Sequence, residues 1–365
     1  MFNNLLKENK IVPNIKDIHF GGGTPSHLTV EEISEIIQNL KKFISIENLS
    51  EFSMEIDPRV VEPKNFEKYA SMGIDRISFG VQDFDPIVQK KINREQPFEL
   101  IESLMNNNLN KYFKGVNFDL LYGLPASSQE TFSRTIELTK QLSPERITLI
   151  KYGHIPKKVK HMKMIKEEDL PDENELPVIF VDSTKKLIEA GYDWVGIDHF
   201  AKKTDQLSIA KQKGEVYRNF GGETPGYTKD MISLGPTSTS GFGNYYFQNT
   251  YDLKEYRQDV NEGRFPVRRG YLLTRDDIIR REVNFSLQCN QVIKIDAINK
   301  KYNIEFKNYF KKEMDLLKKR EDEGLLIITD KKIESTIQGR YFIRHMCQIF
   351  DTFFDYSKEY EIHGN

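Results

Sequence analysis

A run of glycines after a short β-rich segment is the first feature of the chain that could bind a ligand. In Asp17-Ile-His-Phe-Gly-Gly-Gly-Thr-Pro25 the three glycines follow the segment directly. Glycine has no Cβ, so backbone N–H groups in such a turn can come within hydrogen-bonding distance of a carboxylate, a phosphate or a ribose. Taken alone, three glycines are more often explained by a tight turn.

Four further polar side chains stand at or beyond the ends of apolar segments. Glu55 ends the second segment, Gln82 and Arg94 follow the third, and Asp119 lies within the fourth. A guanidinium can donate two parallel hydrogen bonds to a ligand carboxylate, and a carboxylate can accept them from an ammonium or a ribose hydroxyl. Singly, each residue could equally be an ordinary loop or helix-capping residue. Together they predict one polar binding site.

Alternating β-strand and helix patterns would position these side chains. The pattern predicts strands over residues 15–20, 52–56, 76–80, 116–122, 146–152 and 194–197. Helices are predicted from Thr29 in the capping box Thr29-Val-Glu-Glu32, over 63–72 and 97–109, after the cap Ser127-Ser-Gln-Glu130, and over 176–190. This alternation indicates a parallel sheet covered by helices, doubly wound or rolled toward a barrel, with its ligand site at the carboxyl ends of the strands.

Ten motifs spread over nearly the whole chain match one protein family. They are Ile18-His-Phe-Gly-Gly-Gly-Thr-Pro25, Glu55-Ile-Asp-Pro58, Ser78-Phe-Gly-Val-Gln-Asp-Phe84, Asn93-Arg-Glu-Gln96, Asp119-Leu-Leu-Tyr-Gly-Leu-Pro125, Gly196-Ile-Asp-His-Phe-Ala201, Arg218-Asn-Phe220, Thr274-Arg-Asp-Asp277, Ser286-Leu-Gln-Cys-Asn290 and Gly339-Arg-Tyr-Phe-Ile-Arg344. With these motifs the chain resembles the oxygen-independent coproporphyrinogen III oxidases, radical S-adenosylmethionine enzymes of haem biosynthesis. The resemblance implies an α/β fold, namely an incomplete radical-SAM (β/α)6-type open barrel with its first strand missing and a mostly helical carboxyl-terminal domain.

The resemblance also implies a reaction and the residues that bind its cofactor. Family members decarboxylate coproporphyrinogen III, a tetrapyrrole, to protoporphyrinogen IX and bind two molecules of S-adenosylmethionine. By the resemblance, Gly22 and Glu55 would bind the first molecule, and the second would be bound by Gly23, Thr24, Gln82, Arg94 and Asp119. Two more family contacts fall at Gly153 and Thr239, where the family has alanine and isoleucine, so only backbone contacts carry over. No catalytic residue is assigned, and Tyr152, His199 and Arg218 are candidates for lining the substrate cavity.

The chain departs from the family in its cysteines. The family's Cys-x3-Cys-x2-Cys loop, which ligates a four-iron four-sulfur cluster, is absent from the 365 residues. Cys289 and Cys347 lie in apolar helical patterns and are expected to be buried thiols. We therefore expect no metal ligands in this chain, the family's first strand, cluster loop and first helix to be missing, and no turnover by the polypeptide alone. A misplaced start, a decayed gene, a fragment complemented by a separate amino-terminal piece, and a non-catalytic protein that binds S-adenosylmethionine or tetrapyrrole would each explain this departure.

Composition fits a cytoplasmic protein without nucleic-acid or membrane partners. Fifty-three lysines and arginines against 55 aspartates and glutamates give a net charge of −2, which provides no footprint for nucleic acid. We find no membrane-length apolar run and no signal peptide, and two cysteines suit a reducing compartment. We expect a monomer with a tetrapyrrole as its small-molecule partner; the sequence does not identify the electron donor.

The predicted domains are the incomplete barrel at residues 1–201, an extension wrapping the barrel at 202–264 and the helical domain at 265–365. Within the last, Gly324-Leu-Leu-Ile-Ile-Thr329 followed by a helix from Gly339 predicts a small winged fold or a plain hairpin and helix.

Overall fold

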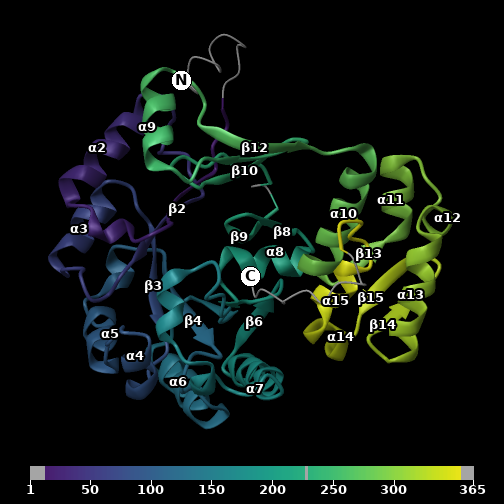
Figure 1. Cartoon of the computed structure of the whole chain (residues 1–365), viewed down its shortest axis with the longest axis horizontal. Helices are drawn as coiled ribbons and strands as arrows, with labels where there is room; N and C mark the ends of the chain where they lie inside the picture. Colours follow the sequence, from purple (N-terminus) through teal and green to yellow (C-terminus); the bar gives the residue numbers. More distant parts are fainter. Residues whose placement is uncertain (1–12, 227–228, 355–365) are drawn as a thin grey trace. The chain divides into compact units, whose positions relative to one another are not determined.

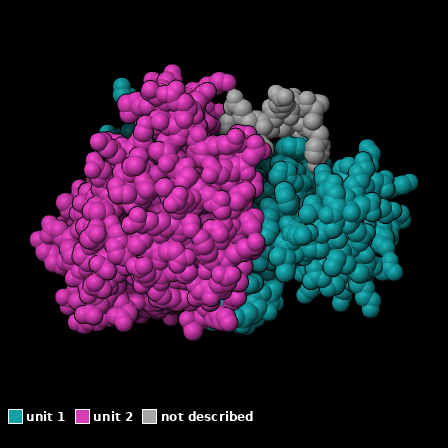
Figure 2. Space-filling model, turned by 90° about the horizontal axis from the view of Figure 1, so that it is seen from below, with its two compact units in different colours: residues 1–12, 195–197, 206–359 teal, residues 13–194, 198–205, 360–365 magenta. Residues whose placement is uncertain are grey.

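The computed structural model describes residues 13–226 and 229–354. These residues form two compact units, coloured separately in Figure 2. One unit, here called the sheet unit, contains residues 13–194 and 198–205, and the other, the carboxyl-terminal unit, contains 195–197 and the described residues from 206 onward. The finer division at residues 201 and 264 stays a prediction.

A seven-stranded sheet organises the sheet unit, with the strand order β1-β2-β3-β4-β5-β7-β6. Strands β1 to β5 pair in parallel, and β7 runs antiparallel to β5. The strands are β1 (Asp17–Phe20), β2 (Glu51–Ile56), β3 (Arg76–Gln82), β4 (Gly115–Tyr122), β5 (Arg146–Lys151), β6 (Tyr192–Val195) and β7 (His199–Lys202). The parallel strands and the helices between them confirm the predicted α/β class.

Helices follow the parallel strands and lie around the outside of the strand ladder in Figure 1. They are α2 (Val30–Lys41), α3 (Lys64–Ser71), α4 (Pro86–Lys91), α5 (Phe98–Met105), α6 (Gln129–Leu142) and α7 (Glu175–Glu189), with short 3-10 turns η1 (Pro25–His27), η2 (Leu109–Lys111), η3 (Lys160–Met164) and η4 (Glu167–Asp169). The capping box of Thr29 and Glu32 is present as predicted. That of α6 is formed by Ser128 and Thr131, one residue later than the predicted pair.

Side chains that alternate along the strands give the sheet one apolar face. Phe52, Phe79 and Phe118 on that face are buried, and Phe66 of α3 packs edge-on against Phe79 with ring centroids 6.5 Å apart. Burying a side chain of this size stabilises the fold by roughly 1.5–3 kcal/mol. The intervening residues face the other side of the sheet and are largely polar, so the apolar core lies between the sheet and its helices.

Four charged residues close the amino-terminal end of the polar face. Arg76 Nε lies 2.9 Å from Glu51 Oε2, and Arg76 Nη2 lies 2.8 Å from Asp205 Oδ2. Arg146 bridges the same two acids, with Nε 2.8 Å from Asp205 Oδ1 and Nη2 2.8 Å from Glu51 Oε2. Burial tends to raise the pKa of Glu51, but Arg146 and Arg76 outweigh it and hold that pKa below its usual value. Two cations and two anions therefore compensate one another inside the sheet.

The carboxyl-terminal unit has its own core. Ile279, Leu287, Phe306, Phe310 and Phe350 are buried in one cluster. Its helices are α8 (Gln206–Lys213), α9 (Leu253–Asn261), α10 (Arg275–Asn290), α11 (Ile295–Tyr302), α12 (Phe306–Tyr309), α13 (Lys311–Asp322), α14 (Ile337–Tyr341) and α15 (Ile343–Gln348). Its strands form the ribbon β8 (Val216–Asn219) and β9 (Gly222–Pro225), the sheet β10 (Thr239–Phe242), β11 (Tyr245–Asn249) and β12 (Val267–Leu272), and the sheet β13 (Val292–Lys294), β15 (Lys332–Ser335) and β14 (Leu326–Ile328).

The sheet of β13, β15 and β14 decides between the two arrangements predicted for the carboxyl terminus. Beyond the predicted hairpin, here β14 and β15, the structure adds β13, which pairs antiparallel with β15. Helices α11 and α13 precede the hairpin, so the segment has the winged arrangement rather than a plain hairpin and helix.

The end of the sheet differs from the prediction. The segment 194–197 was expected as a final strand followed by a loop at Asp198-His199-Phe200, whereas β6 ends at Val195 and His199 begins the antiparallel strand β7. Gly196 adopts a φ of +57°, which allows a tight connection, and the Asp198 carbonyl accepts a hydrogen bond from Leu149 N at 2.8 Å. Among the described helices we find none long and apolar enough to cross a membrane.

We predict that Asp205→Asn destabilises the protein by about 3–5 kcal/mol, because the substitution leaves the buried Arg76 and Arg146 with one acid between them. Urea unfolding followed by circular dichroism measures the change. The matched control is Glu137→Gln, which breaks the Glu137–Lys140 ion pair on α6, where Glu137 is 47% exposed, and should cost less than about 1 kcal/mol. Equal midpoints for the two variants would contradict the compensation argument.

Candidate functional site

The polar face of the sheet holds most of the predicted site residues. Strand register places Ser78 beside Glu55 and beside Asn117, and it places Asp119 beside Gly80 and Thr148. His19 and Ser53 are paired in the same way on β1 and β2. Since β1 to β5 are parallel, their carboxyl ends meet at one edge, which we call the rim.

The glycine turn after β1 lies at the rim. Gly22 and Gly23 adopt φ values of +76° and +70°, and a Cβ on either would meet no heavy atom within 4 Å. Glycine is thus required there by the backbone conformation and not by crowding, and the space beside the turn is open to a ligand. Thr24, which precedes η1, makes no side-chain capping bond, so its hydroxyl is available.

Glu55 is fixed by two groups of the first strand and its turn. Its Oε2 accepts a hydrogen bond from Gly22 N at 3.3 Å, and its Oε1 lies 3.2 Å from His19 Nε2. His19 Nδ1 in turn lies 2.9 Å from Ser53 Oγ. The side chain of Glu55 is still 41% exposed, so it can bind a ligand while it steadies the glycine turn.

Gln82 and Arg94 meet next to Gly80. A Cβ built on Gly80 would lie 2.9 Å from Gln82 Nε2 and 3.1 Å from Arg94 Nη2. Arg94 donates from Nη2 to the Gly80 carbonyl at 3.0 Å and from Nε to Gln96 Oε1 at 3.1 Å. Its Nη1 has only a long ion pair, 3.6 Å from Asp57 Oδ2, and can still donate to a ligand carboxylate.

The segment from Gln82, at the end of β3, to Arg94, after α4, is anchored by buried polar groups. Asp83 accepts hydrogen bonds from the Thr135 hydroxyl and, at 2.9 Å, from Asp85 N. Gln89 Nε2 donates to the carbonyls of Asp83 at 2.9 Å and Gln96 at 2.8 Å. Burial raises the pKa of Asp83 to about 6, and its Oδ2 has no hydrogen-bond partner.

Both carboxylate oxygens of Asp119 accept hydrogen bonds from side chains of the sheet. Its Oδ2 accepts from Ser78 Oγ at 2.7 Å and its Oδ1 from Asn117 Nδ2 at 2.8 Å. Burial, with a contribution from the Glu55 charge, raises the pKa of Asp119. The carboxylates of Glu55 and Asp119 are therefore close enough on the polar face for their charges to affect one another.

The structure brings together Gly22, Gly23, Thr24, Glu55, Gln82, Arg94 and Asp119 around the polar face of β1 to β4. Gly153 follows the end of β5, next to Tyr152, whose backbone N donates to the Tyr122 carbonyl at 2.8 Å. It therefore lies at the same edge of the sheet. Thr239 belongs to the carboxyl-terminal unit, where its carbonyl accepts from Ser233 Oγ at 2.8 Å.

The three candidates for the substrate cavity are engaged with neighbouring groups. Tyr152 Oη lies 3.3 Å from His154 Nδ1, and His199 Nδ1 lies 2.8 Å from Asp198 Oδ1. Arg218 Nη1 donates to Glu223 Oε1 at 2.6 Å. His199 lies in β7 and Arg218 in β8.

Sequence reasoning missed Ser78, Asn117 and Thr148. They are small or neutral and stand inside strands, so no motif of charged residues indicated them. The available signal was the period of two, since Asn117 and Asp119 alternate with the buried Val116, Phe118 and Leu120.

The cysteines do not fit an iron-sulfur cluster, which requires several thiolate ligands. Cys289 is buried in α10 as expected, whereas Cys347 in α15 is only partly buried and places its Sγ 3.8 Å from the Asn284 carbonyl. Burial raises the pKa of Cys347 to about 12, so this thiol stays protonated. Both belong to the carboxyl-terminal unit, whereas the glycine turn belongs to the sheet unit.

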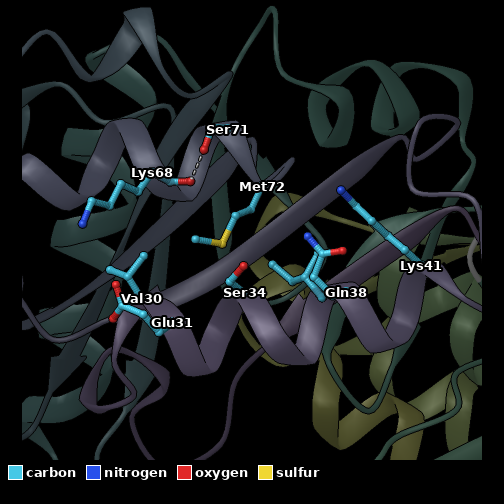
Figure 3. Close-up of a pocket in the computed structure, with 9 residues that line it drawn as sticks. Val30, Glu31, Ser34, Gln38, Lys41, Lys68, Ser71 and Met72 are labelled. Carbon is cyan, nitrogen blue, oxygen red and sulfur yellow. Dashed lines mark hydrogen bonds between the residues drawn. The ribbon is translucent and has the colours of Figure 1, made fainter.

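A hollow of about 500 Å³ lies between α2 and α3, away from the predicted site residues (Figure 3). Its wall combines aliphatic and charged side chains, among them Val30, Met72, Lys41 and Lys68, and the Ser71 hydroxyl donates to the Lys68 carbonyl at 2.7 Å. No predicted ligand contact lines it.

Comparisons with known proteins agree with this geometry. The Radical SAM superfamily model matches residues 2–139, and the HemN C-terminal domain model matches residues 273–342. The chain is 36% identical to the oxygen-independent coproporphyrinogen III oxidase of Salmonella typhimurium and 37% identical to that of Helicobacter pylori, in each case over 93% of this chain and 74% of the relative. The solved structure of coproporphyrinogen III oxidase from Escherichia coli, described as a radical SAM enzyme, matches with a TM-score of 0.89 and 36% identity, covering 93% of this chain and 78% of that one.

The parallel sheet with its glycine turn and polar rim is thus that of a radical SAM protein, a class that uses S-adenosylmethionine and a four-iron four-sulfur cluster. A second family model, that of the HemN C-terminal domain, also matches the chain and distinguishes one family within this class. The chain belongs to the family of oxygen-independent coproporphyrinogen III oxidases.

We predict that Asp83→Asn changes how stability depends on pH. The folded protein raises the pKa of Asp83 above its unfolded value of 3.8, so the contribution of Asp83 to stability is greatest below pH 4 and falls by about 3 kcal/mol as the pH rises through about 6. Asparagine keeps the acceptor for Thr135 but cannot ionise. The variant should therefore gain stability relative to wild type between pH 4 and pH 6, as measured by urea unfolding at each pH, and a constant difference across that window would refute the prediction.

Proposed function

We propose that this protein serves the oxygen-independent oxidative decarboxylation of coproporphyrinogen III to protoporphyrinogen IX in haem biosynthesis, and that its rim binds S-adenosylmethionine. Family membership supports the reaction. The observation that carries the ligand is the convergence of an open glycine turn, two carboxylates and an arginine at one edge of the sheet. S-adenosylmethionine offers a carboxylate, an ammonium, a sulfonium and ribose hydroxyls, for which these groups are complementary.

In this proposal the residues divide between two cofactor molecules. Gly22 and Glu55 hold the first, with the Glu55 carboxylate accepting from its hydroxyl or amino group. The second contacts Gly23, Thr24, Gln82, Arg94 and Asp119. Arg94 Nη1 supports this assignment because it retains donor capacity beside the half-buried amide of Gln82. Gly153, at the same edge of the sheet, contributes a backbone contact, and a contact by Thr239, which belongs to the other unit, stays an expectation from the family resemblance.

The cluster limits what these 365 residues can do alone. In the family it supplies the electron that cleaves S-adenosylmethionine. Since the two cysteines do not fit it, the role that we assign to this chain's own residues is to bind and orient S-adenosylmethionine and the tetrapyrrole. The same observation favours a second candidate function, a non-catalytic protein that binds S-adenosylmethionine or tetrapyrrole.

Calorimetric titration with S-adenosylmethionine tests the proposed site without any metal. Glu55→Gln or Arg94→Gln should weaken binding roughly 10- to 100-fold, since each loses a charge-assisted hydrogen bond of about 1.5–3 kcal/mol. Glu99→Gln on the exposed side of α5 is the matched control and should bind as wild type does. Absence of heat with wild type would rule out the assigned site.

A second experiment separates the two candidate functions. Anaerobic reconstitution of this chain with iron and sulfide should give no cluster absorbance and no 5′-deoxyadenosine, because neither cysteine is an available thiolate. If a polypeptide that carries the Cys-x3-Cys-x2-Cys loop is then added and product appears, the decarboxylation is supported. Binding without product under those conditions supports the non-catalytic candidate.

A further inference from the structure

A layer of neutral polar side chains lies directly beneath the ligand-facing carboxylate of Asp119. It consists of Ser78 on β3, Asn117 on β4 and Thr148 on β5. Strand register pairs Ser78 with Asn117 and Thr148 with Asp119 itself. Asn117 is 9% exposed and Thr148 is 8% exposed. The proposed function gives none of them a ligand contact, yet burying polar side chains such as those of Asn117 and Thr148 is unfavourable unless they are hydrogen-bonded.

Their hydrogen bonds converge on Asp119. Ser78 Oγ donates to Oδ2 at 2.7 Å, and Asn117 Nδ2 donates to Oδ1 at 2.8 Å. Each carboxylate oxygen therefore has its own donor, and the donors come from two different strands. This arrangement fixes the plane of the carboxylate and leaves the remaining lone pairs for a ligand.

Further contacts within the layer orient the two donors. Asn117 Nδ2 donates to Ser78 Oγ at 2.8 Å, so the Ser78 hydroxyl proton is directed to Asp119. The Thr148 hydroxyl lies 3.2 Å from Asn117 Nδ2 and 3.3 Å from Asn117 Oδ1, so it contacts both polar atoms of the amide and holds the amide group beside the carboxylate. The three side chains thus act as one network.

The surroundings of Asp119 otherwise favour its neutral form. Burial and the Glu55 charge on β2 raise its pKa, whereas the hydrogen bonds of Ser78, Thr148 and Asn117 lower it. On β7, His199 pairs in register with Thr148 and is bound to Asp198; in the loop after α4, Arg94 is bound to the Gly80 carbonyl. The three neutral side chains therefore lower the pKa of Asp119, whereas burial and the charge of Glu55 raise it.

We propose that Ser78 and Asn117, oriented by Thr148, are positioning residues that hold the Asp119 carboxylate ionised and correctly turned for an ammonium or hydroxyl of the ligand. Naming that ligand as S-adenosylmethionine rests on the proposed function. The hydrogen-bonded layer itself does not, since its bonds join only side chains of this chain.

Titration of ligand-free protein tests the layer directly. Aspartate labelled with ¹³C at the carboxyl carbon is followed by NMR against pH, with Asp119→Asn identifying the signal. Ser78→Ala should move the Asp119 midpoint upward by about one pH unit, because a hydrogen bond to the ionised form is lost. Ser78→Thr, which keeps the hydroxyl, should restore it, and Glu55→Gln should move the midpoint in the opposite direction.

Two more variants provide an independent test of the layer and a control. Thr148→Val preserves shape and removes the hydroxyl that orients Asn117, so it should also raise the midpoint, and it serves if Ser78→Ala does not fold. Ser53→Ala is the matched control, since its hydroxyl contacts His19 and not Asp119. An unchanged midpoint in both Ser78→Ala and Thr148→Val would overturn the proposal.

Calorimetry with S-adenosylmethionine at a series of pH values then links the layer to binding. Affinity should fall as the pH falls through the Asp119 midpoint, and Ser78→Ala should shift this fall upward by the amount seen in NMR. If NMR shows the upward shift of the Asp119 midpoint but the wild-type protein does not bind S-adenosylmethionine, the proposed function is wrong and the positioning role of the layer is still supported. Wild-type binding with a pH profile that Ser78→Ala does not move would count against the positioning role.

Discussion

The division of one parallel sheet into an apolar face and a polar face is the constraint on which the rest of the sheet unit depends. The apolar face, with Phe52, Phe79 and Phe118, packs against the helices and supplies the hydrophobic stabilisation. The polar face cannot be buried against hydrocarbon without loss, so each of its groups needs a partner. At the amino ends of the strands these partners are oppositely charged side chains, and in the middle of the strands they are neutral hydrogen-bonding groups. At the rim, some hydrogen-bonding atoms remain available to a ligand.

The polar groups thus form three successive levels along the strands, and each level has a different role. Glu51, Arg76, Arg146 and Asp205 bind one another and leave no uncompensated charge. The neutral layer above them transmits strand geometry to Asp119 without introducing a charge of its own. In the proposed site, Glu55 and Arg94 would meet the ligand from elements whose positions the lower levels have already set, which is the preorganisation that binding sites require.

Much of the fold and several site residues could be predicted from the sequence because their signals are local. The strand and helix alternation fixed β1 to β5, and the Thr29 capping box fixed the start of α2. The antiparallel strand β7 could not be predicted in the same way, since its pairing with β5 joins residues about fifty positions apart. Ser78 and Asn117 were missed because their importance lies in which atoms they face across strands.

Ionic strength should distinguish the two ends of this sheet. The four paired charges at the amino ends have side chains between 2% and 23% exposed, where mobile ions screen poorly. Glu55, at 41% exposure, faces solvent, where screening extends over about 10 Å at 0.1 M salt. Added salt can therefore loosen the hold on a charged ligand while the scaffold beneath remains intact, so the protein can release what it binds without unfolding.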